Sequence, residues 1–305
     1  MPSLFWTGKL TLPMRILVNA NSLLALMMGG LTNTTAMKER VKRGYEGEFS
    51  DHVRQYDDLG LHLQERAARI QLEGIDFTGQ RVLDIGCGTG VLSEAALESG
   101  AEEIICGDIS SLMLLEAMRK DSRRHPGYSF CRLDAEDLPY RDNSFDAVIS
   151  GMTFGLIPDQ QRVVDQMVRV VKPGGLVSIG AHGPEHYWEA IDACFRCITK
   201  RYILGYRLEF WPRDEDYVRE LLVRAGLEEI KSKRVTWRNQ FKTGSTAYDF
   251  FAAISASWWY AKFPSEKIGA DSKKTRAYFE RKNKTVITDD IIVAYGKKPM
   301  SNLHG

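Results

Sequence analysis

The chain has no excess of charge of either sign, few cysteines and no long apolar run, and each shortage excludes a class of protein. Its 41 basic and 40 acidic side chains give a formal net charge of +1, so we expect no nucleic-acid partner. Five irregularly spaced cysteines in 305 residues do not form a disulfide framework, which predicts a reducing compartment such as the cytoplasm. The apolar residues 16–31 are interrupted by two asparagines and a glycine pair, too short and too polar for a membrane span.

Acidic residues are missing altogether from residues 1–38, which are rich in apolar side chains. We interpret this stretch as an amphipathic segment that packs on the domain or across a dimer of the chain. An organelle transit peptide and a disordered leader are the alternatives. Rapid proteolytic removal of the segment from an intact fold would exclude the packed interpretation. The remaining chain, with 44% hydrophobic residues overall, is long enough to bury a sizeable core.

The motif that organises the chain is Val-Leu-Asp-Ile-Gly-Cys-Gly-Thr-Gly at residues 82–90, where an apolar run breaks into alternating glycines. With the helical pattern of residues 91–99, it predicts a strand, a tight turn and a helix. The glycines remove the Cβ atoms that would keep a ligand away from the main chain. The start of the helix adds free backbone N–H groups. We therefore expect this turn to touch a bound ligand.

The spacing of these glycines distinguishes two classes of ligand. Dinucleotide enzymes use G-x-G-x-x-G with the pyrophosphate at the helix N-terminus, whereas this turn is G-x-G-x-G and has Val91 in place of the last glycine. Asp84, just before the turn, would repel a pyrophosphate but suits a cationic or amino-bearing ligand. Asp108, at the end of the apolar residues 104–107, can accept two hydrogen bonds from a ribose diol. A nucleoside without a diphosphate is the simplest ligand that meets both conditions.

Strands and helices alternate regularly after the turn, which predicts a parallel sheet wound on both faces, with ligands at the carboxyl ends of its strands. The motif Lys-Pro-Gly-Gly at residues 172–175 is expected to end a helix and turn the chain into the next strand. The segment at about 239–288 is longer than a hairpin needs, which indicates a helical cap. The expected later strands are residues 103–107, 128–132, 145–150, 176–181, 228–237 and 290–296, and the expected helices are residues 91–99, 111–120, 159–171 and 215–224.

Four further motifs follow the glycine turn: Gly-Asp-Ile-Ser at 107–110, Asp-Ala-Glu-Asp-Leu-Pro at 134–139, Phe-Asp-Ala-Val-Ile-Ser at 145–150 and Val-Lys-Pro-Gly-Gly at 171–175. In this order and at these intervals, the five motifs resemble the class I S-adenosylmethionine-dependent methyltransferases over roughly residues 45–185. They are most similar to the branch that contains the ubiquinone and menaquinone C-methyltransferases. The resemblance implies an α/β fold with a doubly wound, seven-stranded, mostly parallel Rossmann-like sheet, N-terminal helices and closing antiparallel strands. It also implies methyl transfer from S-adenosylmethionine to a small aromatic or lipophilic acceptor, which releases S-adenosylhomocysteine.

The resemblance also implies which residues bind the cofactor. Asp84 would interact with its amino group, Asp108 would bind the ribose hydroxyls, and Ile109 would cover one face of the adenine. Asp134 and Ala135 would meet the adenine edge, although a turn or helix cap is an alternative for Asp134. The residues expected beneath the methionine part of the cofactor are Gly86, Cys87, Gly88 and Gly90. Those expected near its amino group and near the acceptor are Ser150, Gly151 and Met152. The aromatic residue expected near the methionine end is Tyr56 or, less favoured, Tyr45, with packing on the core as the alternative for both tyrosines.

Residues beyond 182 are expected to determine the acceptor. Many are aromatic, and most aromatics simply form a core, yet ring faces can also stabilise a sulfonium and exclude water. His182 and His186, just past the fifth strand, are the candidates for a general base, with a structural or substrate-orienting role as the alternative. Cys194 and Cys197 lie one helical turn apart without a second pair, so we expect two buried helix cysteines and no zinc site. The alternative is a metalloid-binding pair, which the resemblance to arsenite methyltransferases of this fold would imply. We expect three segments: residues 1–38, a cofactor-binding core at 39–182, and a substrate-side part at 183–305.

Two other functions remain compatible with a nucleoside-binding turn. A dinucleotide-dependent oxidoreductase is disfavoured by the glycine spacing and by Asp84. A catalytically silent protein that binds the nucleoside to regulate a partner is disfavoured because all the cofactor positions are intact. Fold alone does not choose between acceptors, since one fold serves many. A small-molecule acceptor, with the chain acting as a monomer or a homo-oligomer, is the expected partner.

Overall fold

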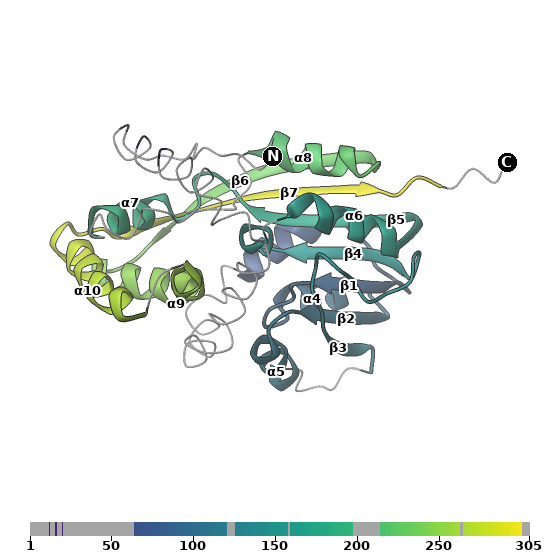
Figure 1. The fold of residues 1–305 in the computed structure, drawn as a ribbon, viewed down its shortest axis with the longest axis horizontal. Coiled ribbons are helices and arrows are strands. Elements are labelled where there is room, and N and C mark those ends of the chain that lie inside the picture. The colour runs from purple at the N-terminus through teal and green to yellow at the C-terminus, as the bar shows by residue number, and fades with distance from the viewer. Residues whose placement is uncertain are drawn as a thin grey trace. The chain divides into compact units, whose positions relative to one another are not determined.

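The computed structural model describes residues 64–120, 126–157, 159–197, 214–262 and 265–300, together with Leu12, Ile16 and Ala20. Tyr45, Tyr56 and nearly all of residues 1–38 lie outside these ranges. The described residues contain a seven-stranded sheet in the order β3-β2-β1-β4-β5-β7-β6 (Figure 1). The strands are β1 (Arg81–Ile85), β2 (Glu103–Asp108), β3 (Tyr128–Arg132), β4 (Phe145–Gly151), β5 (Val171–His182), β6 (Glu228–Gln240) and β7 (Val286–Lys297).

The pairs β1/β2, β1/β4, β2/β3 and β4/β5 are all parallel. Helices connect these strands because parallel neighbours need a crossover. The expected doubly wound α/β fold is therefore confirmed. The labelled helices are α4 (Val91–Glu98), α5 (Ser111–Lys120), α6 (Gln160–Val170), α7 (Trp188–Cys197), α8 (Glu215–Arg224), α9 (Gly244–Lys262) and α10 (Ser265–Arg281), and residues 64–72 are also helical.

Side chains alternate between two cores, one on each face of the sheet. In β4, Val148 joins the core with α6 and α8, whereas Ala147 and Ile149 join the core with α4, α5 and the helix at residues 64–72. This period of two is what a strand covered on both faces requires. The three layers place the ends of β1, β2, β4 and β5 at a common edge, which is where the residues of the candidate site begin.

The last two strands run antiparallel to their neighbours. Gly174 donates to the Lys298 carbonyl near the start of β5, whereas Gly183, just past its end, donates to the Asp290 carbonyl. Because the pairing partners move in opposite directions along the chain, β7 opposes β5. The helices α9 and α10 are inserted between β6 and β7. This arrangement confirms the expected closing strands and the helical insertion before the last strand.

The described residues fall into two compact units. The core unit contains residues 64–181, 214–234 and 292–300, and the second unit contains residues 182–197 and 235–291 with the gap noted above. No described helix is both long enough and apolar enough to cross a membrane.

One local expectation was wrong. The motif at residues 172–175 does not separate a helix from a strand, because α6 ends at Val170 and β5 begins at Val171. The register between β4 and β5 shifts between Phe145 and Ala147, and Gly174 has a φ of +77°. The motif is thus an irregular start of β5, held by the backbone bonds of Gly174 and Gly175 with Lys298.

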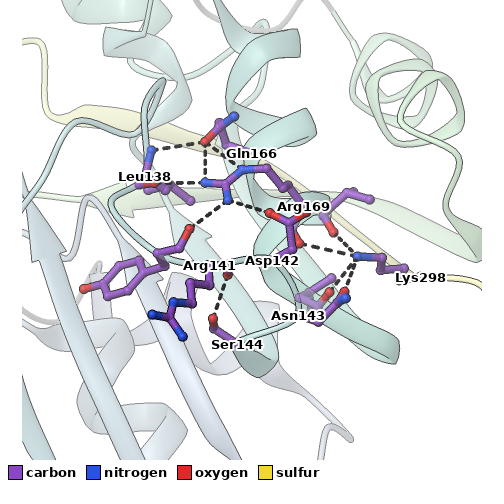
Figure 2. A network of polar contacts seen from close by, with 11 residues as sticks. Leu138, Arg141, Asp142, Asn143, Ser144, Gln166, Arg169 and Lys298 are labelled. Atoms are coloured by element: carbon purple, nitrogen blue, oxygen red, sulfur yellow. Dashed lines mark hydrogen bonds and ion pairs between the residues drawn. The ribbon is translucent and has the colours of Figure 1, made fainter.

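A polar network fixes the loop that precedes β4 (Figure 2). Arg169 on α6 donates to the carbonyls of Tyr140 at 2.7 Å and Leu138 at 2.9 Å, and to Asp142 Oδ1 at 2.9 Å. Lys298 Nζ donates to the Val168 carbonyl at 2.8 Å, so it caps the end of α6. The network lies at the amino end of β4, whereas the candidate site residues lie at the carboxyl ends of the strands.

Candidate active site

The glycine turn of residues 86–90 leads from β1 into α4, as the sequence predicts. Gly86, Gly88 and Gly90 have φ values of +68°, +55° and +91°, in the left-handed region that side chains disfavour. A Cβ atom at Gly88 would meet no atom of the described residues within 4 Å, whereas one at Gly86 would lie 2.4 Å from the Thr153 side chain. The position of a Cβ is therefore open at Gly88 and is filled by Thr153 at Gly86, while both glycines are partly exposed.

Asp108, at the end of β2, is joined to this turn. Its Oδ2 accepts from the Gly88 N–H at 2.9 Å and its Oδ1 accepts from the Ser110 N–H at 2.8 Å. Burial raises the pKa of this carboxyl, and the backbone hydrogen bonds oppose that rise. A carboxylate oxygen has more than one acceptor site, so both oxygens can still accept from hydroxyl groups of a ligand.

Asp84 in β1 is fully buried at the base of the turn. Its Oδ2 accepts from Ser93 Oγ at 2.6 Å, whereas its Oδ1 has no hydrogen-bond partner among the described residues. Burial raises the pKa of Asp84 to about 7, and the nearby charge of Asp108 adds to this. A buried carboxylate with an unsatisfied oxygen is costly, and a cationic ligand close to it would compensate that cost.

Two other predicted cofactor residues, Asp134 and Ile109, make contacts that hold the local backbone. Asp134 Oδ1 accepts from the Glu136 N–H at 2.9 Å, the turn-capping contact considered for it above. The Ile109 carbonyl accepts from Arg132 Nε at 3.1 Å, and the side chain of Ile109 is half-buried. Ala135, the neighbour of Asp134, is also half-buried. The proposed contacts of these residues with adenine stay predictions.

Cys87 and Ser150 are both buried. Burial and the neighbouring Cys106 thiol raise the pKa of the Cys87 thiol, which keeps it a neutral part of the turn. Ser150 Oγ donates to the Ile85 carbonyl at 2.8 Å, so this hydroxyl joins β4 to β1. A cofactor contact of Ser150 or of its neighbour Gly151 stays a prediction.

The sequence does not identify two residues that contact this region: Thr153, which contacts Gly86 of the turn, and Gln71, which contacts the end of β4. Gln71 is buried in the helix at residues 64–72, and its Nε2 donates to the Ser150 carbonyl at 3.1 Å. The available sequence signal is that Gln71 is a polar residue on the same helix face as Ala67, Ala68 and Leu72, which are all buried. Thr153 offers no sequence signal, because its contact with Gly86 arises only in the folded chain.

His182 and His186, the predicted base candidates, lie together in the second unit. Their ring centroids are 4.5 Å apart. Burial lowers the pKa of His182 to about 4 and, with the charge of His182, lowers that of His186 as well. Nδ1 of His186 accepts from the Asp290 N–H at 3.2 Å. Both rings are therefore neutral at pH 7, and the proton of His186 is on Nε2.

Two adjacent acids of β7 surround His186 and were also missed. Asp290 accepts from Thr236 Oγ1 at 3.0 Å and from the Glu185 N–H at 2.7 Å. Asp289 accepts from the side-chain amide of Asn239 and lies 3.7 Å from His186 Nδ1. The signal for these acids is their position in the middle of an otherwise apolar strand, where burial requires hydrogen-bond partners.

The cysteine pair lies in α7 as expected, but only one of the two cysteines is buried. Cys194 is buried, Cys197 is partly exposed, and neither forms a disulfide. Burial raises the pKa of both thiols. Among the described residues, no three His, Cys, Asp or Glu side chains are grouped so that they could hold a metal ion.

The strand order, the glycine turn and the carboxylates that flank it define a class of protein. An open main chain at Gly88, Asp108 beside it and an unsatisfied Asp84 oxygen fit an adenosyl group that carries a positive charge. Residues 83–179 match the family described as "Methyltransferase domain". The chain belongs to the class I S-adenosylmethionine-dependent methyltransferases, so it is an enzyme and its cofactor is S-adenosylmethionine.

Three known proteins show what this chain is similar to, one in sequence and two in fold. The chain is 32% identical to the demethylmenaquinone methyltransferase of Paenarthrobacter aurescens in an alignment of 213 residues, and this alignment covers 63% of this chain and 79% of the relative. Its fold is similar to that of the YcgJ protein of Bacillus subtilis, with a TM-score of 0.54, 16% identity and coverage of 77% and 99% of the two chains. It is also similar to phosphoethanolamine N-methyltransferase 2 of Haemonchus contortus, with a TM-score of 0.54, 18% identity and coverage of 85% and 61%.

Proposed function

We propose that this methyltransferase methylates a small aromatic or lipophilic acceptor. The observation that carries the proposal is a cluster of rings in the second unit. The buried Tyr187 lies edge-on to Phe250 and Phe251, with centroids 6.2 and 6.0 Å away, and Phe241 lies 5.0 Å from Phe250. Ring faces of this kind can pack against a flat apolar ligand as well as against one another. The relatives named demethylmenaquinone methyltransferases, whose name implies a lipophilic ring as acceptor, support the same class.

We assign the cofactor to the residues around the glycine turn. Bound S-adenosylmethionine supplies an electrophilic methyl group on a positively charged sulfur. Asp108 would accept from the ribose hydroxyls, and the main chain at Gly88 would lie beneath the methionine part. Asp84 would supply negative charge near the amino group, directly or through water. Asp134, Ala135 and Ile109 would surround the adenine. The other residues of the proposed set are Gly86, Cys87, Gly90, Ser150, Gly151 and Tyr56.

His182 is the better of the two base candidates. His186 already uses its Nδ1 lone pair to accept from Asp290, so it is suited to hold the neighbouring ring in place. With a pKa of about 4, His182 is neutral at pH 7 and accepts a hydrogen bond or, for a short time, a proton. A ring acceptor that loses a proton on methylation would use this group.

The acceptor class can be tested directly. The purified chain would be incubated with S-adenosylmethionine and, in separate reactions, a demethylmenaquinol analogue, a simple phenol and phosphoethanolamine. We expect methylated product, detected by mass spectrometry with an equal amount of S-adenosylhomocysteine, from at least one aromatic acceptor. Methylation of phosphoethanolamine alone would contradict the proposal.

The base assignment has its own test. Replacing both His182 and His186 with Gln should lower kcat and remove the acid limb of its pH profile, because neither amide can accept a proton. The single variant His182→Gln should account for most of the loss. An unchanged turnover and pH profile in the double variant would show that neither histidine is the base.

The proposal also includes a cellular location and an oligomeric state. The cysteine usage supports a reducing, cytoplasmic location, with organelle targeting by residues 1–38 as the alternative. We also keep a homo-oligomer as a proposal. Mass measurement of the full chain in solution tests it.

A further inference from the structure

The segment that follows β4 contains a residue in an unfavourable backbone conformation. Met152 has a φ of +56°, which residues with a side chain adopt rarely. Its N–H donates to the Gly180 carbonyl of β5 at 2.7 Å. Backbone outliers of this kind persist only where the surroundings fix them, and they concentrate at functional sites. The contacts that fix Met152 therefore point to residues that matter for the site.

Thr153 makes the contact that joins this segment to the glycine turn. Its hydroxyl oxygen lies 3.0 Å from the Gly86 carbonyl oxygen and 3.0 Å from the Gly151 carbonyl oxygen, so its single proton is shared between these two acceptors. Its Oγ1 and Cγ2 both lie 2.4 Å from the point where a Cβ of Gly86 would stand. The absence of a side chain at Gly86 thus makes room for Thr153.

The turn is fixed on its other side by the main chain. The N–H groups of Gly86 and Cys87 donate to the Gly107 carbonyl of β2 at 2.7 and 3.0 Å. Gly88 follows directly, and its N–H donates to Asp108. Two strands therefore hold the turn, β2 through backbone bonds and β4 through the Thr153 side chain.

Gln71 holds the end of β4 from the helix at residues 64–72. Its Nε2 donates to the Ser150 carbonyl at 3.1 Å and to Ser178 Oγ at 3.3 Å. Its Oε1 lies 2.2 Å from the position of a Cβ at Gly180, so glycine there makes room for it. Gln71 thus joins the end of β4 to β5. Because Thr153 comes two residues after the end of β4, these bonds help to fix its position relative to Gly86.

We propose that Thr153 is a positioning residue of the methyltransferase: it pins the first glycine of the turn to the end of β4 and so keeps the open main chain at Gly88 in the shape that the cofactor needs. The proposal rests on the assignment of the turn to the cofactor. Methyl transfer depends on alignment of the reacting atoms at contact distance, so a turn free to shift would lower both cofactor affinity and kcat.

The test compares variants that keep or lose the hydroxyl. Thr153→Val keeps the shape and removes the donor, and Thr153→Ser keeps the donor. The matched control is Thr275→Val in α10, where a buried threonine hydroxyl donates to the Asp271 carbonyl at 2.8 Å. Titration calorimetry with S-adenosylhomocysteine should give a Kd raised about 3- to 10-fold for Thr153→Val, within about 2-fold of wild type for Thr153→Ser, and unchanged for Thr275→Val.

Kinetics and thermal midpoints complete the test. Thr153→Val should also lower kcat at saturating cofactor, whereas Thr275→Val should lower the thermal midpoint alone. Wild-type affinity in Thr153→Val, or in Thr153→Ala if the valine variant does not fold, would overturn the proposal. An equal loss of affinity in Thr275→Val would overturn it as well. The titration needs no acceptor, so a wrong acceptor class leaves this test intact, and failure of the wild-type chain to bind would instead refute the cofactor assignment.

Discussion

Two buried carboxylates on neighbouring strands, Asp84 and Asp108, set the electrostatics of the candidate site. Ser93 satisfies one oxygen of Asp84, and the other oxygen lacks a partner among the described residues. Ionisation of the Asp84 carboxyl group therefore costs free energy in the ligand-free protein. A positively charged cofactor would reduce that cost.

The pKa of Asp84 predicts how stability depends on pH. Folding raises this pKa from 3.8 to about 7, so the folded chain holds a proton that the unfolded chain loses. The stability that this group contributes is full below pH 4 and is lost as the pH rises through 7. As the pH rises from 5 to 8, the free energy of unfolding of wild type should therefore fall by roughly 2 kcal/mol relative to that of Asp84→Asn, measured by urea unfolding. A difference that does not change with pH would contradict the account.

The histidine pair predicts the opposite dependence. Folding lowers the pKa of His182 from 6.5 to about 4, so the unfolded chain binds the proton first as the pH falls. The stability that the neutral ring contributes is full above pH 6.5 and is lost toward pH 4. The double variant His182→Gln/His186→Gln should lose less stability than wild type between pH 7 and pH 5. Equal losses in both proteins would mean that the histidines are not kept neutral by burial.

At the scale of elements, the loop before β4 and the helix α6 depend on one guanidinium group. Arg169→Met would leave the carbonyls of Leu138 and Tyr140 without their donor, which should cost about 1–3 kcal/mol in urea unfolding. The affinity of the Arg169→Met variant for S-adenosylhomocysteine should stay at the wild-type value, because this loop lies at the amino end of β4 and the cofactor residues lie at the carboxyl ends of the strands. Arg224→Met is the control, since the exposed pair of Arg224 with Glu220 should contribute less than about 1 kcal/mol. Equal costs in the two variants would contradict the assigned role of Arg169.

The elements were also the level at which the sequence was most informative. Helical patterns predict α5 and α8 with the bounds that the structure has. The start of β5 was missed because Pro173 and Gly174 indicate a turn locally, whereas pairing with Lys298 makes this stretch part of a strand. Tertiary pairing overrode the local signal there.

At the scale of the whole molecule, the glycine turn and Asp108 were readable because a ligand that touches the main chain requires glycines and an acid at fixed positions along the chain. Gln71, Thr153 and Asp290 were not readable because their partners are far away in sequence, such as Ser178 for Gln71 and His186 for Asp290. The acceptor is equally hard to read, since rings serve both as a core and as a binding surface.

The central claim is that the glycine turn, with Asp108 beside it, binds the adenosyl cofactor. Titration calorimetry of the wild-type chain and of Asp108→Asn with S-adenosylhomocysteine tests it most directly. We predict saturable binding by the wild-type chain and an affinity at least about 10-fold lower for Asp108→Asn, because an amide is a weaker acceptor than a carboxylate for ribose hydroxyls. No binding by the wild-type chain, or equal affinity in the two proteins, would contradict the claim.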